Sequence, residues 1–368
     1  MFNPIVIHMN SKPIYNIHFT QSYNILPDII LNEVLNNTGK SNRKVFIVAD
    51  SNVATYHLQA VIKQLEDNNI TNFSYTFLAG EENKHTGTIG NIYEKLIDNH
   101  LDRNDLLIAL GGGVCGDMTG FAAATYLRGI KFIQLPTSLL AMVDSSIGGK
   151  TGVDYNGYKN MVGAFHMPSA VITNTEVLKT LPDREYISGF AEIIKHALID
   201  DKDYYNFLFD NSTAALNKDL DVVAQIIYKS CNIKKKVVEE DPTEKGIRAH
   251  LNFGHTLGLA IDKYMNFNLL HGECVSLGCI ASMYISYRRG HITLEEFNNA
   301  KELFSMYGLP VKINNLNKNE VINITSNDKK ADGNTIKFVL LKCIGQAYID
   351  TTVTKQEMYD ALSIICEE

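Results

Sequence analysis

Hydrophobic residues in the first half of the chain form short runs separated by amphipathic stretches. These runs are apolar at consecutive positions, which is typical of strands covered on both faces of a parallel sheet. The predicted strands are Lys44–Asp50, Phe73–Leu78, Asp105–Leu110, Lys131–Leu135 and Ala170–Thr173. Helical spacing predicts helices over Val53–Asn68 and Thr88–Asn99. Strands that alternate with helices favour a Rossmann-like parallel sheet.

The second half has helical spacing and few strand signals. The predicted helices are Asp183–Asp200, Asp219–Glu240, Asn252–Asn266, His271–Arg289 and Leu294–Tyr307. One short strand signal is present at Ile336–Leu341. Because the composition changes near Asn174, we expect an α/β protein with a Rossmann-like domain over residues 1–174 and a mainly helical domain over residues 175–368.

Composition and charge exclude several classes of protein. The chain has 368 residues and a net charge of −7 with both signs mixed, and it carries no basic stripe that would favour nucleic acid. No apolar run approaches the roughly 20 residues of a membrane span, and no signal peptide is evident. The six cysteines are scattered without a CxxC pair. We therefore expect a reduced, cytoplasmic protein that does not bind zinc through cysteine.

A glycine-rich loop is the first candidate for ligand chemistry. Gly111, Gly113 and Gly116 satisfy G-x-G-x-x-G between a predicted strand and the helix-like stretch Met118–Tyr126. This order suits a phosphate at a helix N-terminus, although a plain tight turn would explain it too. No acidic residue ends the next strand, where the usual ribose contact is expected. Asp50 ends an earlier strand, where it could contact a ribose or cap the following helix.

A second segment carries many charges among glycines, which suits the lining of a cleft better than a core. Its polar residues are Asp144, Lys150, Asp154, Lys159 and Asn160. The tetrapeptide Gly148–Thr151 looks like the end of a phosphate-binding P-loop. The first glycine of that motif would be Asp144, whose charge repels phosphate, so we reject an ATPase or kinase.

The helical half contains a possible metal site. Glu192, Lys195 and His196 stand at positions i, i+3 and i+4 on one helical face. Spacing alone favours a solvated face with a Glu–Lys pair. Together with His255 and His271, however, Glu192 could form an open zinc site that water or substrate completes. Spacing does not decide between these interpretations.

Taken together, these segments resemble the 3-dehydroquinate synthase family of the sugar-phosphate cyclase superfamily. The resembling motifs are GGGVCGDMTGF, QLPTSLLAMVDSSIGGKTGVD, GYKNMVGAF, TLPDREYISGFAEIIKH, GIRAHLNFGHTLGLAID, LLHGECVSLG and NDKKADGNTIKFVLL, in the family order over nearly the whole chain. The resemblance implies a dehydroquinate synthase-like fold, with a Rossmann-like NAD-binding domain followed by an all-helical metal-binding domain. It also implies an enzyme that is commonly a homodimer, with a small sugar-phosphate acid as substrate.

The implied activity is that of a lyase of the shikimate pathway, which leads to chorismate and aromatic amino acids. It would convert 3-deoxy-D-arabino-heptulosonate 7-phosphate to 3-dehydroquinate and phosphate, with NAD and a zinc or cobalt ion as cofactors. The steps would be transient oxidation at C5, phosphate elimination, re-reduction and aldol ring closure, so that NAD ends as it began.

The resemblance assigns site residues by motif. The implied metal ligands are Glu192, His255 and His271. The implied NAD contacts are Asp50, Asn52, Glu81, Lys84, Gly113, Val114, Cys115, Gly116, Asp117, Thr137, Ser138, Lys150, Lys159, Val177, Leu178, Lys179 and Thr180. The implied catalytic residues are Asp144, Lys150, Lys195, Lys234, Arg248 and Asn252. The implied substrate contacts are Arg128, Lys150, Lys159, Asn160, Arg248, Lys329 and Lys330, with Arg128 reaching the phosphate from a neighbouring subunit.

The chain departs from the family pattern at Leu259, where the family has a second histidine that contacts substrate and could transfer protons. Glu244, His250 or His196 could substitute for it, or turnover is reduced. Three alternatives stay open: a related cyclase with another sugar phosphate, a polyol or glycerol-phosphate dehydrogenase of the same superfamily, and a member that binds nucleotide without turnover.

Overall fold

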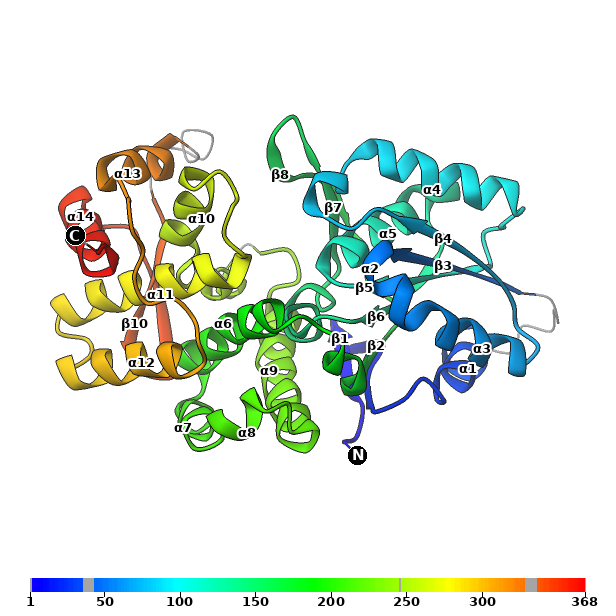
Figure 1. Ribbon diagram of the computed structural model, residues 1–368, viewed down its shortest axis with the longest axis horizontal. Helices are drawn as coiled ribbons and strands as arrows, with labels where there is room; N and C mark the ends of the chain where they lie inside the picture. Colours follow the sequence, from blue (N-terminus) through cyan, green and yellow to red (C-terminus); the bar gives the residue numbers. More distant parts are fainter. Residues whose placement is uncertain (1, 36–42, 245, 328–335, 368) are drawn as a thin grey trace. The chain divides into compact units, whose positions relative to one another are not determined.

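The computed structural model describes residues 2–35, 43–244, 246–327 and 336–367 (Figure 1). The chain divides into two compact units, Met1–Leu181 with Lys234–Pro242 and Pro182–Ile233 with Thr243–Glu368. Asn174, where we expected the domain boundary, is the last residue of a strand of the first unit. The return of residues 234–242 to the first unit had no signal in the sequence.

The first unit is built on a seven-stranded sheet in the order β1-β2-β9-β6-β5-β3-β4. The strands are β1 (Ile5–Met9), β2 (Lys12–Thr20), β3 (Lys44–Asp50), β4 (Thr71–Phe77), β5 (Leu106–Gly111), β6 (Lys131–Pro136) and β9 (Ala170–Asn174). All neighbours are parallel except β1 and β2, which form an antiparallel hairpin. This pairing confirms the predicted parallel sheet. Its apolar runs occupy consecutive positions because they are buried on both faces.

Helices cover both faces of this sheet. The helical segments are α1 (Leu26–Asp28) with Ile29–Val34, α2 (Ser51–Val53) with Ala54–Leu58, α3 (Gln59–Asp67), α4 (Thr86–Asp98) and α5 (Gly113–Thr125). In Figure 1, α4 and α5 lie on one face, and α1 and α3 lie on the other. Shorter helical turns cover Glu81–Asn83, Tyr126–Arg128, Ala141–Ser145 and Thr175–Lys179. A separate antiparallel hairpin of β7 (Lys150–Tyr155) and β8 (Tyr158–Phe165) packs against α5.

The second unit is arranged around α11 (His271–Arg288), which is buried along most of its length. The other elements are α6 (Asp183–Asp200), α7 (Lys202–Asp210), α8 (Ser212–Leu216), α9 (Leu220–Glu240), the turn Ile247–Asn252, α10 (His255–Tyr264), α12 (Leu294–Met306), α13 (Lys318–Asn327), β10 (Phe338–Cys343), β11 (Gln346–Asp350) and α14 (Lys355–Ile365). The end of α9, from Lys234 on, belongs to the first unit. Helices α6, α10, α12 and α14 pack on α11.

The helical character of this unit is confirmed, with one correction. It is not all-helical, because β10 and β11 pair as an antiparallel hairpin whose apolar residues, such as Leu340, are buried against α11. Among the residues that the structure describes, no helix is both long and apolar enough to span a membrane.

Candidate functional site

The glycine-rich loop forms a tight passage from a strand to a helix. β5 ends at Gly111, Gly112 is extended, and α5 begins at Gly113, before the predicted start at Met118. The backbone N–H of Thr137 donates to the carbonyl of Gly111 at 3.0 Å, which joins the ends of β5 and β6. The first N–H groups of a helix lack intrahelical acceptors and favour an anion. The predicted strand–turn–helix geometry is therefore present.

Val114 and Cys115, the two residues after Gly113, differ in how accessible their side chains are to a ligand at the start of α5. The thiol of Cys115 is buried and donates to the carbonyl of Val48 at 3.3 Å, toward the core. A ligand at this helix start could therefore contact Cys115 only through its backbone. Val114, the second residue of the helix, is partly exposed.

The carboxylate of Asp50 caps the following helix and also lies near the glycine turn. Its Oδ1 accepts hydrogen bonds from the N–H groups of Asn52 at 2.9 Å and Val53 at 3.0 Å, so the helix-cap interpretation is confirmed. Its Oδ2 lies 3.3 Å from the point where a Cβ on Gly111 would stand. Because parallel strands end at one edge of the sheet, this carboxylate sits where a dinucleotide ribose is expected.

A buried lysine joins residues from three predicted contact segments. The ammonium of Lys84 donates to Asp117 Oδ2 at 2.8 Å and Asn160 Oδ1 at 2.6 Å, and lies 3.7 Å from Glu81 Oε1. Burial opposes the charge of Lys84, but the neighbouring carboxylates raise its pKa overall. Burial raises the pKa of Asp117, against the effect of Lys84. The backbone N–H of Asp154 donates to the carbonyl of Lys84 at 2.8 Å, which fixes the β7–β8 hairpin beside this cluster.

Asp144 and Lys234, both predicted to be catalytic, are in contact within the first unit. The buried ammonium of Lys234 donates to both the backbone carbonyl and Oδ1 of Asp144. Three other predicted cations, Lys150, Lys159 and Arg128, are exposed on β7, on β8 and after α5. The remaining predicted substrate residues, Lys329 and Lys330, lie outside the described residues.

The segment Val177–Thr180 follows β9. Leu178 is fully buried, so its side chain faces the core. Lys179 pairs with Glu176 at 2.8 Å, and Thr180 Oγ1 lies 2.7 Å from the Nε2 of His57. The segment therefore contacts the helical run after Asp50 at the same edge of the sheet.

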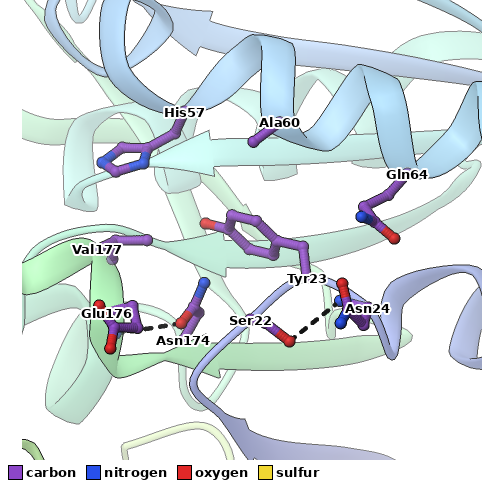
Figure 2. A pocket seen from close by; sticks show the side chains of 9 residues that line it. All are labelled: Ser22, Tyr23, Asn24, His57, Ala60, Gln64, Asn174, Glu176 and Val177. Atoms are coloured by element: carbon purple, nitrogen blue, oxygen red, sulfur yellow. Dashed lines mark hydrogen bonds between the residues drawn. The ribbon is translucent and has the colours of Figure 1, made fainter.

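A cavity of about 300 Å³ adjoins this segment at the carboxyl ends of β2 and β9. Figure 2 shows Tyr23 between the helical residues above it and those after β9 below it. The lining residues are Ser22, Tyr23, Asn24, His57, Ala60, Gln64, Asn174, Glu176 and Val177. Burial lowers the pKa of His57. Apart from Val177, sequence reasoning missed this cavity, because β2 was not predicted and Ser22–Asn24 therefore had no place on the sheet edge.

In the second unit, the three predicted metal ligands converge. Glu192 lies in the middle of α6, while His255 and His271 are the first residues of α10 and α11. The Nε2 of His271 is 3.0 Å and the Nε2 of His255 3.5 Å from Glu192 Oε1. One ligand atom from each of the three residues lies within 4.8 Å of the others.

Two glycines of α11 allow this convergence. A Cβ on Gly272 would stand 1.9 Å from the carbonyl oxygen of Ser188, one turn before Glu192 on α6. A Cβ on Gly278 would also stand 1.9 Å from a carbonyl oxygen, that of Gly254. Side chains at these positions would push α11 away from α6 and from the start of α10. The glycines therefore set the distances between the three ligand side chains.

The donor set fits a divalent cation. The Nδ1 of His255 lies 3.1 Å from the carbonyl of Phe253, and we assign the proton to Nδ1 from this contact, which leaves the Nε2 lone pair toward Glu192. Burial, together with Lys195, lowers the pKa of His255 to about 4, so the ring is neutral. Burial alone would raise the pKa of Glu192, but Lys195 and His271 hold it well below its usual value. Two imidazoles and a carboxylate are the ligands of an open zinc site.

Three other predicted residues lie on α6 or in the turn that precedes α10. Lys195 is buried and forms an ion pair with Glu192 one turn earlier on α6. Arg248 is buried in the turn Ile247–Asn252, which packs on α6. Asn252 ends that turn, and its amide donates to Glu244 Oε1 at 3.0 Å.

The position where the family has a second histidine is half exposed: Leu259 on α10 is 47% exposed. His196, one of the suggested substitutes, is buried on α6, and its Nδ1 lies 2.7 Å from Ser230 Oγ. Its role in proton transfer stays a prediction.

Solved structures show the fold class first. One is 2-epi-5-epi-valiolone synthase from Streptomyces hygroscopicus subsp. jinggangensis with NAD+ and Zn2+ bound, with a TM-score of 0.85, 22% identity and 99% of each chain covered. Another is 2-deoxy-scyllo-inosose synthase complexed with carbaglucose-6-phosphate, NAD+ and Co2+, with a TM-score of 0.85, 23% identity and coverage of 98% of this chain and 99% of the other. The chain has the fold that these synthases share, as expected from its sequence.

Sequence comparisons define the family. The model for the 3-dehydroquinate synthase N-terminal region matches residues 74–188, and that for the C-terminal region matches residues 189–331. The 3-dehydroquinate synthase of Ruminiclostridium cellulolyticum is 44% identical over 309 residues, which are 84% of this chain and 86% of the relative. The chain belongs to the 3-dehydroquinate synthase family, and the predicted resemblance is confirmed.

Proposed function

We propose that the protein catalyses conversion of 3-deoxy-D-arabino-heptulosonate 7-phosphate to 3-dehydroquinate and phosphate, with NAD and a zinc or cobalt ion as cofactors. Membership of the family supports this activity over most of the chain. The observation that carries the proposal within the structure is the convergence of Glu192, His255 and His271. The neutral imidazole of His255 and the ionised carboxylate of Glu192 have the protonation states that a metal ligand needs.

When bound, NAD supplies a transient acceptor for the hydride at C5 and the metal ion supplies Lewis-acid polarisation of the oxygen on that carbon. The chain's own groups would bind and orient these reactants. The start of α5 at Gly113 would bind the pyrophosphate through backbone N–H groups, and Asp50 would accept from a ribose hydroxyl. Lys84 would hold Asp117 and Asn160 in fixed positions, since it contacts both.

The substrate is an acid and a phosphate ester, and the predicted contacts supply cations for both ends. Lys150 and Arg248 would bind the carboxylate, and the guanidinium of Arg248 suits a bidentate contact. Lys159 and Asn160 would bind the phosphate together with Lys329 or Lys330. Arg128 is exposed and would reach the phosphate of a neighbouring subunit, so we propose a homodimer. We also propose that the enzyme acts in the cytoplasm.

The test is to supply the heptulosonate phosphate with NAD+ and zinc, and to measure phosphate release together with 3-dehydroquinate. We expect both products in equal amounts, no NADH beyond one equivalent per site, and loss of activity with a chelator. Net accumulation of NADH would instead indicate a dehydrogenase. Phosphate release only from sugar phosphates without a carboxylate would indicate a different cyclase, and NAD+ binding without turnover would indicate a protein that only binds nucleotide.

A further inference from the structure

Each glycine of the turn Gly111–Gly113 has a polar side chain close to the place where its own Cβ would stand. The nearest side-chain oxygen is 3.3 Å away at Gly111, 3.4 Å at Gly112 and 3.1 Å at Gly113. The first two atoms belong to Asp50 and Ser138, which the family motifs assign to the cofactor. The third is the Oγ of Ser145, which no motif assigns.

Ser145 is the last residue of the turn Ala141–Ser145, directly after Asp144. Its Oγ lies 3.1 Å and its Cβ 3.5 Å from the Cβ position of Gly113, so the hydroxyl points at the first residue of α5. This hydroxyl is buried and has no hydrogen-bond partner among the residues that the structure describes. Burial of a hydroxyl without a partner is unfavourable, and a ligand group that accepts its proton would remove that cost.

The surroundings indicate what kind of acceptor would suit it. The N-terminus of the 13-residue helix α5 favours negative charge. Gly113 carries no side chain, so a ligand can approach both the backbone and the Ser145 hydroxyl. On the neighbouring glycine, Ser138 Oγ accepts from the N–H of Ala141 at 3.2 Å, which directs its own proton elsewhere. Two hydroxyl donors therefore flank the start of α5.

We propose that the Ser145 hydroxyl donates a hydrogen bond to a pyrophosphate oxygen of the bound dinucleotide and so positions it on α5. The proposal rests on the proposed function, because it takes NAD as the ligand. In this role Ser145 contributes to binding of the dinucleotide, because it adds an uncharged hydrogen-bond donor beside the N-terminus of α5. It explains why this hydroxyl is buried against a glycine.

The test compares Ser145→Ala and Ser145→Cys with the matched control Ser146→Ala. The hydroxyl of Ser146 is also buried without a partner among the described residues, but no glycine of the turn has it as a close neighbour. The readouts are the dissociation constants for NAD+ and ADP-ribose by calorimetry, and the melting temperature with and without NAD+. ADP-ribose keeps the pyrophosphate and lacks nicotinamide.

We expect both Ser145 variants to bind NAD+ and ADP-ribose about tenfold more weakly, the usual scale for one hydrogen bond to a charged group, and Ser146→Ala to bind within about twofold of the parent. The melting temperature without NAD+ should be unchanged or higher in Ser145→Ala, because an unsatisfied buried group is removed. If Ser145→Ala does not fold, Ser145→Cys keeps the volume and carries the test.

Parent-like affinity in both Ser145 variants overturns the proposal. Weaker binding of NAD+ alone also overturns it, since the contact would then be to the nicotinamide half. If the parent protein itself does not bind NAD+, the proposed function fails, and this inference fails with it. If the parent binds NAD+ and both Ser145 variants bind it equally well, only this inference fails.

Discussion

The ion pair between Glu192 and Lys195 makes Glu192→Gln an informative change. Glu192 is 0% exposed and Lys195 1% exposed. A neutral glutamine would leave the Lys195 ammonium buried without its counterion, and breaking a buried pair in this way costs about 3–5 kcal/mol. His271 differs, because its side chain is 37% exposed and its removal leaves the pair intact. We therefore expect His271→Ala to cost only about 1 kcal/mol in the metal-free protein.

Both variants lose one ligand of the proposed metal site, so zinc affinity should fall at least about 100-fold in each. Stability is measured by urea unfolding with a chelator present, and zinc affinity by competition with a chromophoric chelator. The double variant Glu192→Gln, Lys195→Met should recover most of the lost stability, because neither charge remains. Equal stability of Glu192→Gln and His271→Ala would refute the buried-pair argument, and unchanged zinc affinity would refute the ligand assignment.

Three further changes test other parts of the second unit. Burial lowers the pKa of His255 from 6.5 to about 4, so the unfolded chain binds more protons between these values. The metal-free protein should therefore lose up to about 3 kcal/mol as the pH falls from 6.5 to 4, and His255→Asn should lose this slope in unfolding titrations. Leu259→His should raise kcat up to about 100-fold if proton transfer limits turnover, and an unchanged kcat would mean that another group carries the proton. Arg289 makes a bidentate contact with Glu357 at 2.7 and 3.0 Å and reaches Asp350 at 2.9 Å. Arg289→Ala should lower the free energy of unfolding by about 1–3 kcal/mol without changing kcat, and a loss of kcat at full stability would contradict this structural role.

The parallel sheet was the most predictable part of the fold. Lys44–Asp50 was predicted with the bounds that β3 has, because a strand buried on both faces is apolar at consecutive positions. The hairpin Lys150–Phe165 was missed, since β8 is exposed at most positions and is rich in polar and glycine residues. The start of α5 was placed too late because glycine has a low helix propensity. Its glycines are tolerated there because neighbouring side chains pack against them.

The candidate site was predictable as residue types, but its geometry was not. The sequence placed Glu192, His255 and His271 on separate helices and left a solvated face as the simpler interpretation. Their contact depends on Gly272 and Gly278, which bring α11 onto the backbone of its neighbours. Such an approach is a tertiary property without periodicity in the sequence. The Ser145 hydroxyl was missed for the same reason, since its neighbour Gly113 lies 32 positions earlier in the chain.

We expect Lys195 to link the stability of the metal-free protein to the binding of a metal ion and substrate. With Glu192 ionised and His255 neutral, the Lys195 ammonium already balances the charge of the cluster. A divalent cation would compete with this ammonium for the same carboxylate, and the two cations would repel each other in a buried site. A substrate anion that accepts from Lys195 would reduce that repulsion. Metal and anionic substrate would then favour each other's binding, and because linkage is reciprocal, each would raise the affinity for the other by the same factor.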